Sequence, residues 1–322
     1  MTTDDALFFI DANKYLDLYR TMTGRHSLAG IGQQADHIFV TQKVVDEVKR
    51  NTIKETANFL TNHFNELPLV NTNVPDQLFG ATEDQSKSIK RQVDDIRRTI
   101  KQVNTDLRTL KMDIMKKVGQ STDEVSTVLA PIFAKAVPHS DKQLQQAKAR
   151  KERGDPPGKK TDPIGDELTW EQILCQFVGK TKLWIVTRDS DYGSMYGEKQ
   201  AEKGFLNRLL YDELQQVSPG AEAFLFANVP DAIQHFADVT GVKADELPTP
   251  EQREEMKKEE EEIKEKEESL SPSQALDWMF TGTDPAFYDA HRRYQQRRRR
   301  AFFDTQGRLQ PLTLSLPPEP DT

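Results

Sequence analysis

The chain alternates short apolar runs with segments whose apolar residues recur at helical spacing. The predicted strands lie at 7–10, 37–41, 183–187 and 223–227, and the predicted helices at 13–20, 42–60, 166–177, 199–216 and 230–239. Continuous apolar runs are typical of strands buried on both faces of a parallel sheet. The alternation of strand and helix therefore predicts an α/β fold with a central parallel sheet.

Between the two α/β parts lies a segment with a different period. Its apolar positions are spaced alternately four and three residues apart, at Ile89, Val93, Ile96, Ile100, Val103, Leu107, Leu110 and Ile114. This is a heptad seam, which predicts a long helix that buries one stripe against a partner. Two shorter helices are expected after Ser121 and over 141–153. We expect a coiled-coil-like helical hairpin, with either these helices or a second chain as the partner of the seam.

These patterns predict a core that is split by an insertion and followed by two further segments. The expected parts are 1–79 and 158–243 for the two halves of the core, 80–157 for the helical insertion, 244–270 for an acidic linker or helix, and 271–322 for a tail with an Arg-rich segment. The hydrophobic fraction of 36% and the charged fraction of 30% agree with a core that carries extended, solvated parts.

The charge distribution and the cysteine content indicate the kind of binding partner and the cellular compartment. The net charge is −8, yet residues 87–117 hold ten basic side chains against four acidic ones, while 251–268 hold ten glutamates against five basic residues. A basic middle favours nucleic acid as a partner despite the acidic total. A single cysteine, an N-terminus without a basic signal region and the lack of a long apolar run predict a cytoplasmic protein that does not enter a membrane.

Four acidic residues lie directly after a predicted strand or near the start of a predicted helix. They are Asp11, Glu47, Asp166 and Asp189. Because the carboxyl ends of parallel strands share one edge of a sheet, these side chains are expected to gather there. Several carboxylates in one place repel each other unless a divalent cation neutralises them, and oxygen ligands suit Mg²⁺ or Mn²⁺. The pattern predicts a metal site for phosphodiester chemistry.

The stretches LFFIDANKYLDLY, VTQKVVDEVKR, GDELTW and VTRDSDYG resemble the PIN domain of metal-dependent nucleases. The segment DPPGKKTDPIGDELTWEQIL further resembles a bacterial PIN-like subgroup with a long helical insertion. The resemblance implies a three-layer α/β/α fold and hydrolysis of phosphodiester bonds, RNA above all, by water that the metal activates. It makes Asp11, Glu47, Asp166 and Asp189 the metal ligands and catalytic residues, with Asp191 as an accessory ligand.

Four further residues are candidates for binding the substrate: Asn13, Thr187, Lys159 and Lys160. Most candidates in the site also have a plain structural alternative, which for Asn13 is a role in a turn or helix cap. Asp11 and Asp166 are residue types that cap helices, and Glu47 is expected otherwise to face solvent as a partner of Lys43 or Arg50. Asp191 could cap a following helix, Thr187 could simply end a strand, and the two lysines could lie in a solvated loop.

Two other functions remain open at this stage. One is a helical interaction or scaffold protein whose PIN-like core holds metal poorly. The other is a structure-selective DNA nuclease related to flap nucleases. The basic insertion is expected to attract phosphate groups without regard to sequence, or else to be the ordinary polar face of a coiled coil. The seam over 89–114 is expected to join a second copy of the chain or a protein partner.

Overall fold

The structure is a computed structural model that describes residues 5–69, 83–158, 164–197 and 203–269. The chain divides into two compact units, Met1–Glu262 and Ile263–Thr322, and the fold described is that of the first unit. The candidate residues Lys159 and Lys160 lie outside the described residues, and so does the tail 271–322 with its Arg-rich segment.

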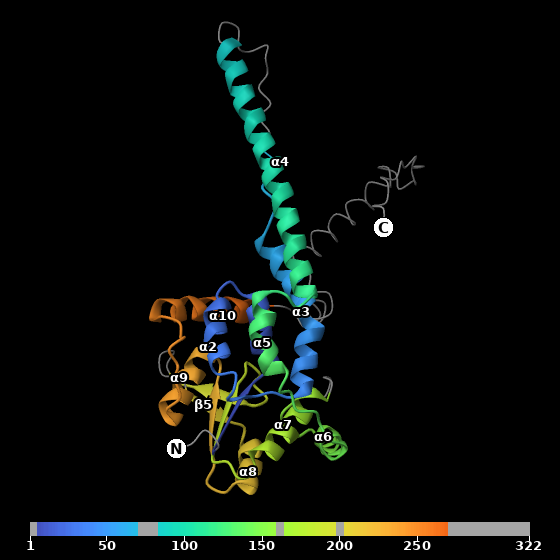
Figure 1. Cartoon of the computed structure of the whole chain (residues 1–322), viewed down its shortest axis with the longest axis vertical. Helices are drawn as coiled ribbons and strands as arrows, with labels where there is room; N and C mark the ends of the chain where they lie inside the picture. Colours follow the sequence, from blue (N-terminus) through green and yellow to red (C-terminus); the bar gives the residue numbers. More distant parts are fainter. Residues whose placement is uncertain (1–4, 70–82, 159–163, 198–202, 270–322) are drawn as a thin grey trace, which may run out of the picture. The chain divides into compact units, whose positions relative to one another are not determined.

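A six-stranded sheet lies at the centre of the first unit (Figure 1), in the order β2-β1-β3-β6-β5-β4. Its strands are β1 (Ala6–Ile10), β2 (Ile38–Phe39), β3 (Lys182–Val186), β4 (Gly193–Tyr196), β5 (Lys203–Leu206) and β6 (Glu222–Phe226). The first four in spatial order, β2, β1, β3 and β6, pair in parallel, and β5 and β4 complete the sheet in antiparallel. The predicted parallel centre of the sheet is therefore confirmed.

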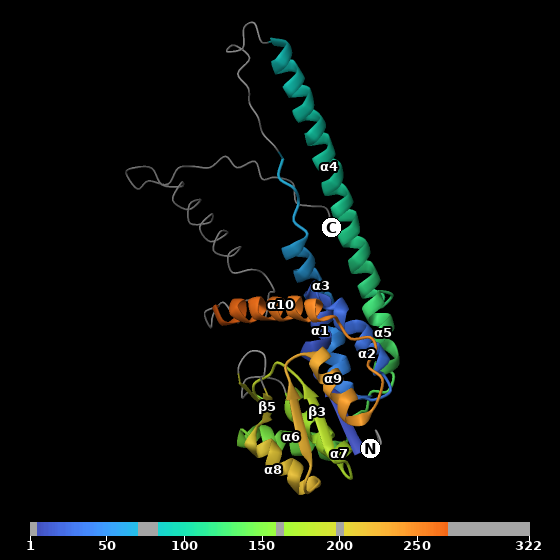
Figure 2. The ribbon, with the colours of Figure 1, turned by 90° about the vertical axis from the view of Figure 1, so that its left-hand side faces the viewer.

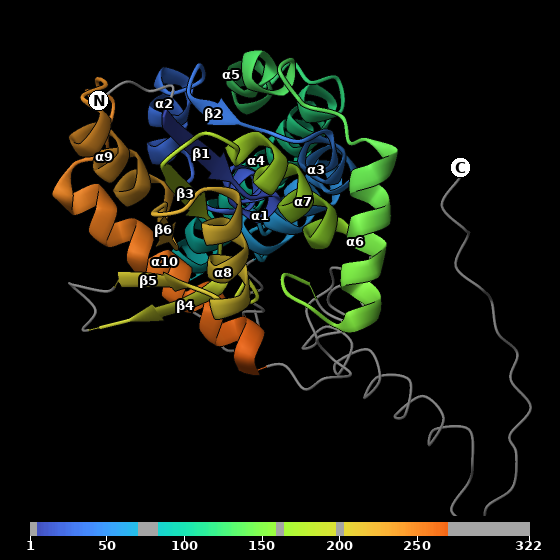
Figure 3. The ribbon, with the colours of Figure 1, turned by 90° about the horizontal axis from the view of Figure 1, so that it is seen from below.

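Helices cover both faces of the sheet. The helices that position the site are α1 (Ala12–Arg20), α2 (Arg25–Gln33), α3 (Gln42–His63), α7 (Gly165–Phe177), α8 (Arg208–Val217) and α9 (Val229–Thr240). On one face the ring of Phe236 from α9 packs against Phe8 and Trp184. Figure 3 shows α7 on the opposite side of the strands from α9. This is the three-layer α/β/α arrangement expected from the sequence.

The helix expected over 199–216 is wrong in its first part. In the structure Lys203–Leu206 is strand β5, and helix α8 begins only at Arg208. The strand was not recognised because it is short and exposed, with Phe205 57% exposed. Gly204 lets it approach β6, since a Cβ atom there would lie 2.1 Å from the carbonyl oxygen of Leu225. The pairing of β5 with β6 thus depends on a close backbone approach, which hydrophobic periodicity does not reveal.

The middle of the chain folds as three helices, α4 (Glu83–Gly119), α5 (Glu124–Phe133) and α6 (Asp141–Arg153). Figure 1 and Figure 2 show α4 extending away from the sheet, with α5 near its lower end. Helix α5 contacts α2, and α6 contacts α7, so neither runs along the length of α4. Along α4 the seam residues Ile89, Ile96 and Leu110 are about half exposed. The hairpin expected within the insertion is not seen in the described residues.

The last helix of the middle segment is anchored to the core by Arg150, whose side chain is 3% exposed. Its guanidinium donates to Glu171 on α7 at 2.9 and 3.0 Å and to Glu213 on α8 at 2.8 Å. The indole nitrogen of the buried Trp170 donates to the same Glu213 at 2.7 Å. These contacts hold α6, α7 and α8 together. Trp170 therefore belongs to the core and not to a surface that could stack a base.

Residues Pro250–Ser269 form helix α10, which contains the whole acidic run 251–268. Of the two states expected for the acidic segment, a linker or a helix, the structure has the helix over these residues. No described helix is both long enough and apolar enough to cross a membrane.

Candidate active site

Asp11 lies at the carboxyl end of β1 and at the start of α1, where it is buried. Its Oδ1 accepts a hydrogen bond from the backbone N–H of Ala12 at 2.7 Å. Its Oδ2 accepts hydrogen bonds from Asn13 Nδ2 and from Thr187 Oγ1, both at 2.7 Å. Asp11 is thus the N-cap of α1, as the structural alternative held, and its second oxygen is directed to the end of β3. Capping the helix leaves that oxygen available to the site.

The end of β3 supplies the next three polar residues. The hydroxyl of Thr187 donates to Asp11 and accepts a hydrogen bond from the backbone N–H of Asp189 at 2.9 Å. The Oδ1 of Asp189 in turn accepts one from the backbone N–H of Asp191 at 3.0 Å. This turn sets both aspartates beside the end of β3. The next element is strand β4, so Asp191 does not cap a helix.

Two helices bring the remaining acids to the same place. Glu47 lies in the second turn of α3, beside the buried Val44 and Val48. Among the described residues it forms no ion pair with Lys43 or Arg50, in contrast to the structural alternative. Asp166 is the second residue of α7, whose N-cap is Ile164 and not Asp166. Asp166 is therefore not tied up as a helix cap, and its carboxyl group is available to the site.

The ionisation of Asp11 shows that these carboxyl groups share one neighbourhood. The pKa of Asp11 is raised to about 6, chiefly by burial, and the negative charges of Glu47 and Asp189 contribute to this rise. The hydrogen bond from Thr187 acts in the opposite direction, because it stabilises the carboxylate form. The charges that act on Asp11 therefore come from two other parts of the fold, helix α3 and the end of β3.

Asp166 is perturbed more strongly by the same surroundings. Its pKa is raised to about 8, chiefly by burial, and the charges of Asp11, Asp189, Glu47 and Glu167 contribute to this rise. The four acids predicted from the sequence thus act on one another, although they stand far apart along the chain. Such mutual repulsion between partly buried carboxylates is frequent at functional sites.

The donor set fits a hard divalent cation in its chemistry. Carboxylate oxygens are the ligands that Mg²⁺ and Mn²⁺ prefer, and a cation would remove the repulsion that raises the pKa of Asp11 and of Asp166. The buried Oδ1 of Asn13 has no hydrogen-bond partner and is a further oxygen at this place. In the described parts of the chain, however, no three histidine, cysteine, aspartate or glutamate side chains are close enough together to hold a metal ion.

Three basic residues that the sequence analysis did not select lie near these acids. The side chain of Lys43, on α3, lies over Gly165, where a Cβ atom would come within 2.6 Å of Lys43 Cε. Lys14 stands one turn of α1 after Asp11 and is almost fully buried. Arg188 stands between Thr187 and Asp189 and pairs with Asp17 at 3.0 Å. Their closeness in sequence to the candidate acids was the signal that could have identified Lys14 and Arg188.

Glu167 lies next to Asp166 but has a structural partner. Its side chain is 1% exposed and forms an ion pair with Lys151 of α6 at 3.0 Å. This pair, like the contacts of Arg150, joins α6 to α7. Glu167 thus contributes charge to the surroundings of Asp166 while its own carboxylate is engaged with Lys151.

The fold and the placement of these acids agree with a comparison against known families. The family model described as a PIN like domain matches residues 7–193, more than half of the 322 residues, and the chain belongs to this family. PIN domains are in general nucleases and typically use divalent metal ions. No curated protein and no solved structure matches the chain.

Proposed function

We propose that this protein is a metal-dependent nuclease that hydrolyses phosphodiester bonds, most readily those of RNA. The observation that supports this best is the electrostatic coupling of Asp11, Glu47, Asp166 and Asp189 at the carboxyl edge of the sheet. These four residues would hold Mg²⁺ or Mn²⁺, with Asp191 as an accessory ligand. The bound ion would stabilise negative charge on the phosphate and on the leaving oxygen.

The other residues of the site have positioning roles in this proposal. Thr187 and Asn13 hold Asp11 in one orientation through hydrogen bonds to the same oxygen, Oδ2. Holding a charged ligand in place before the substrate binds lowers the cost of organising the site. Asn13 and Thr187 lie where they could also contact a phosphate, and Lys159 and Lys160 remain candidates for the same contact.

The long helix α4 would add attraction to the phosphate backbone. Ten of its side chains between 87 and 117 are basic and four are acidic. Such attraction does not depend on sequence and weakens as salt rises. We propose RNA and not DNA as the substrate because of the family resemblance.

The seam of α4 is proposed to join a second copy of the chain in parallel. One flank of the seam holds Lys90, Arg97 and Lys111, and the other holds Asp106 and Asp113. In a parallel pair each flank faces the opposite flank of its partner, which brings basic residues to acidic ones. In an antiparallel pair like flanks meet, so basic residues would face basic residues. The distribution of charge therefore favours the parallel arrangement.

The test of the nuclease activity is cleavage of single-stranded RNA and DNA in the presence of Mg²⁺ or Mn²⁺, with and without EDTA. Wild type is expected to cut RNA faster than DNA, and Asp11→Asn is expected to lose the activity. Asp46→Asn is the matched control, because Asp46 is an exposed neighbour of Glu47 on the same helix. Equal cleavage by wild type and Asp11→Asn would show that the activity belongs to a contaminant.

Two results would favour the alternatives. Absence of cleavage with either ion would favour an interaction or scaffold protein with a PIN-like core. Cleavage of branched DNA in preference to single-stranded RNA would favour a structure-selective DNA nuclease.

A further inference from the structure

Helix α10 places a carboxylate in a cradle of hydrogen-bond donors on the loop between α1 and α2. Glu259 accepts hydrogen bonds from the backbone N–H of Met22 at 2.7 Å and of Thr23 at 2.9 Å, and from the Thr23 hydroxyl at 2.6 Å. Three donors converge on one carboxylate, and two of them are backbone groups. Convergent backbone N–H groups of this kind form binding sites for anions.

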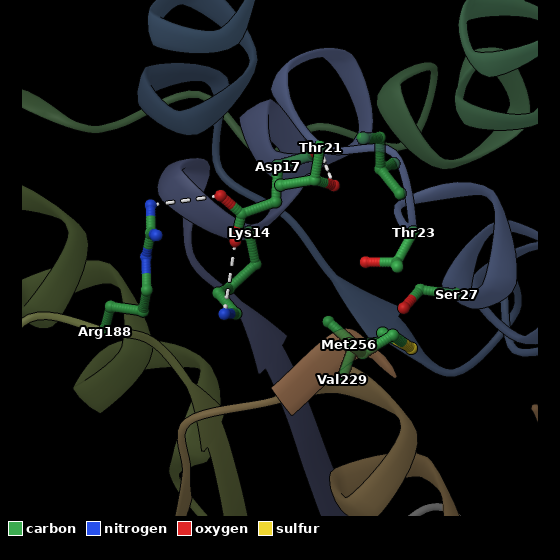
Figure 4. Close-up of a pocket in the computed structure, with 9 residues that line it drawn as sticks. Lys14, Asp17, Thr21, Thr23, Ser27, Arg188, Val229 and Met256 are labelled. Atoms are coloured by element: carbon green, nitrogen blue, oxygen red, sulfur yellow. Dashed lines mark hydrogen bonds and ion pairs between the residues drawn. The ribbon is translucent and has the colours of Figure 1, made fainter. Parts of the chain in front are cut away.

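Thr23 of the cradle also lines a neighbouring pocket, which holds two basic side chains and one acidic one. Lys14, Asp17, Thr23, Arg188 and Met256 line it, together with smaller residues (Figure 4). Lys14 pairs with Asp17 at 3.2 Å, and Arg188 pairs with the same carboxylate at 3.0 Å. We call this pocket the Thr23 pocket.

The Thr23 pocket adjoins the candidate active site through two of its residues. Arg188 stands between Thr187 and Asp189 at the end of β3, and Lys14 follows Asp11 by three positions on α1. In a helix, residues three apart lie on the same side. A chain of phosphates that passes Asp11 and Asp189 can therefore continue towards Lys14 and Arg188.

The donors in the pocket suit a phosphodiester group. A backbone phosphodiester carries one negative charge on two non-bridging oxygens, as a carboxylate does on its two oxygens. The N–H groups of Met22 and Thr23 and the Thr23 hydroxyl can thus donate to either anion in the same way. The hydroxyl of Ser27, which also lines the pocket, adds a further donor.

Three contacts fasten α10 over this pocket. Besides Glu259, Met256 is buried against the pocket wall and Arg253 pairs with Asp231 at 3.4 Å. These residues recur every third position and so lie along one side of the helix. In Figure 2 the orange helix α10 crosses above the strands near α1 and α9.

We propose that the Thr23 pocket and the cradle at its edge bind a backbone phosphate of nucleic acid, and that Glu259 occupies the cradle in the free protein as an internal substitute. The identity of the ligand rests on the proposed nuclease function. Binding of nucleic acid then requires Glu259 to leave the cradle. The glutamates of α10 repel the phosphate chain until that happens, so the helix limits the affinity of the free protein.

The test measures binding without cleavage. A labelled single-stranded RNA oligonucleotide is titrated with the full-length protein in EDTA, and its fluorescence anisotropy gives the affinity at several salt concentrations. Glu259→Gln is expected to bind roughly fivefold more tightly than wild type, because the internal anion is neutralised. Adding Arg188→Gln to this variant is expected to lower the slope of log affinity against log salt by about 0.7, as for one lost phosphate contact.

Glu254→Gln is the matched control, since Glu254 is exposed on the same helix and its change alters the net charge equally. Equal gains in affinity from Glu254→Gln and Glu259→Gln would reduce the effect to general charge and overturn the proposal. A lower melting temperature of Glu259→Gln with unchanged affinity would also overturn it, because Glu259 would then only fasten α10.

The outcome is separable from that of the nuclease proposal. If the protein fails to cleave RNA but Glu259→Gln binds RNA more tightly, the phosphate site is supported and the proposed nuclease activity is contradicted. If the protein cleaves RNA but Glu259→Gln does not change its affinity for RNA, the nuclease activity is supported and the phosphate site is contradicted.

Discussion

The hydroxyl of Thr187 donates a hydrogen bond to Asp11 Oδ2 across 2.7 Å, and so joins the ends of β1 and β3. The two residues are 176 positions apart in the chain, and the whole middle segment lies between them. Their contact follows from the parallel register in which Ile10 pairs with Val186. Each residue is the next one along its strand, so the sheet sets them side by side.

Thr187→Val is expected to lower nuclease activity roughly tenfold, the equivalent of about 1.4 kcal/mol. Valine keeps the shape of threonine but cannot donate to Asp11. Since that hydrogen bond lowers the pKa of Asp11, its loss is expected to raise the pKa above its value of about 6. The acid limb of the pH profile of kcat/KM should then move to higher pH. Thr187→Ser keeps the hydroxyl and should restore the profile; an unmoved limb in Thr187→Val would contradict the positioning role.

Asp166→Asn is expected to stabilise the metal-free protein, and more at pH 8 than at pH 5. The pKa of Asp166 is raised to about 8 in the folded state, against about 4 when unfolded. The protonated carboxyl therefore favours the folded state below pH 4, and this stability is lost as pH rises through 8. Asparagine does not ionise, so Asp166→Asn removes this loss of stability.

Urea unfolding in EDTA at pH 5 and pH 8 measures this effect. The gain in unfolding free energy should be greater at pH 8 by about 1–3 kcal/mol, and added Mg²⁺ should reduce it, because the cation neutralises the site. Asp46→Asn, on the exposed side of α3, serves as the control and should change little. A gain in unfolding free energy that is equal at both pH values would show that the surroundings of Asp166 do not raise the pKa of its carboxyl group in the folded state.

The parts of the fold that sequence reasoning predicted are those set by continuous apolar runs. The strands at Ala6–Ile10 and Lys182–Val186 are buried on both faces, so their composition reveals them. The acids that follow these strands could be selected because a parallel sheet dictates where its carboxyl ends meet. The short exposed hairpin of β4 and β5 has no such signal, and the pairing of β5 with β6 depends on the close approach that Gly204 permits.

The charged contacts of the site were beyond sequence reasoning for a different reason. Lys14 and Arg188 meet around Asp17 only because α1 and the end of β3 are adjacent in space. The contact of Glu259 with Thr23 spans 236 positions. Neither spacing nor composition marks one glutamate among the ten of the acidic run.

Arg150→Met is expected to destabilise the protein by about 3 kcal/mol. Glu171 and Glu213 would lose their cation, and Glu171 has only a tenth of its side chain exposed. Removing one partner leaves the other charges buried without compensation, which costs more than the pair itself contributes. Thermal or urea unfolding measures the change. Arg153→Met is the control on the same helix, because Arg153 is exposed and pairs with Asp155 at the surface. This change should cost less than about 0.5 kcal/mol. Equal losses would show that the network of Arg150 adds no stability.

Ile96→Lys in α4 is expected to yield a monomer if the seam joins copies of the chain, because a charge at the centre of the seam cannot be buried. Light scattering gives the mass, and Arg98→Ala, away from the seam, should keep the assembly of the wild type.

The direction of pairing is tested by Ile96→Cys combined with Cys175→Ser, which removes the native exposed thiol. In a parallel pair the two new thiols lie opposite each other, so mild oxidation should link the chains efficiently. A wild type of monomeric mass would exclude self-association. A dimer that fails to link through Ile96→Cys would instead place the two helices antiparallel, against the charges on their flanks.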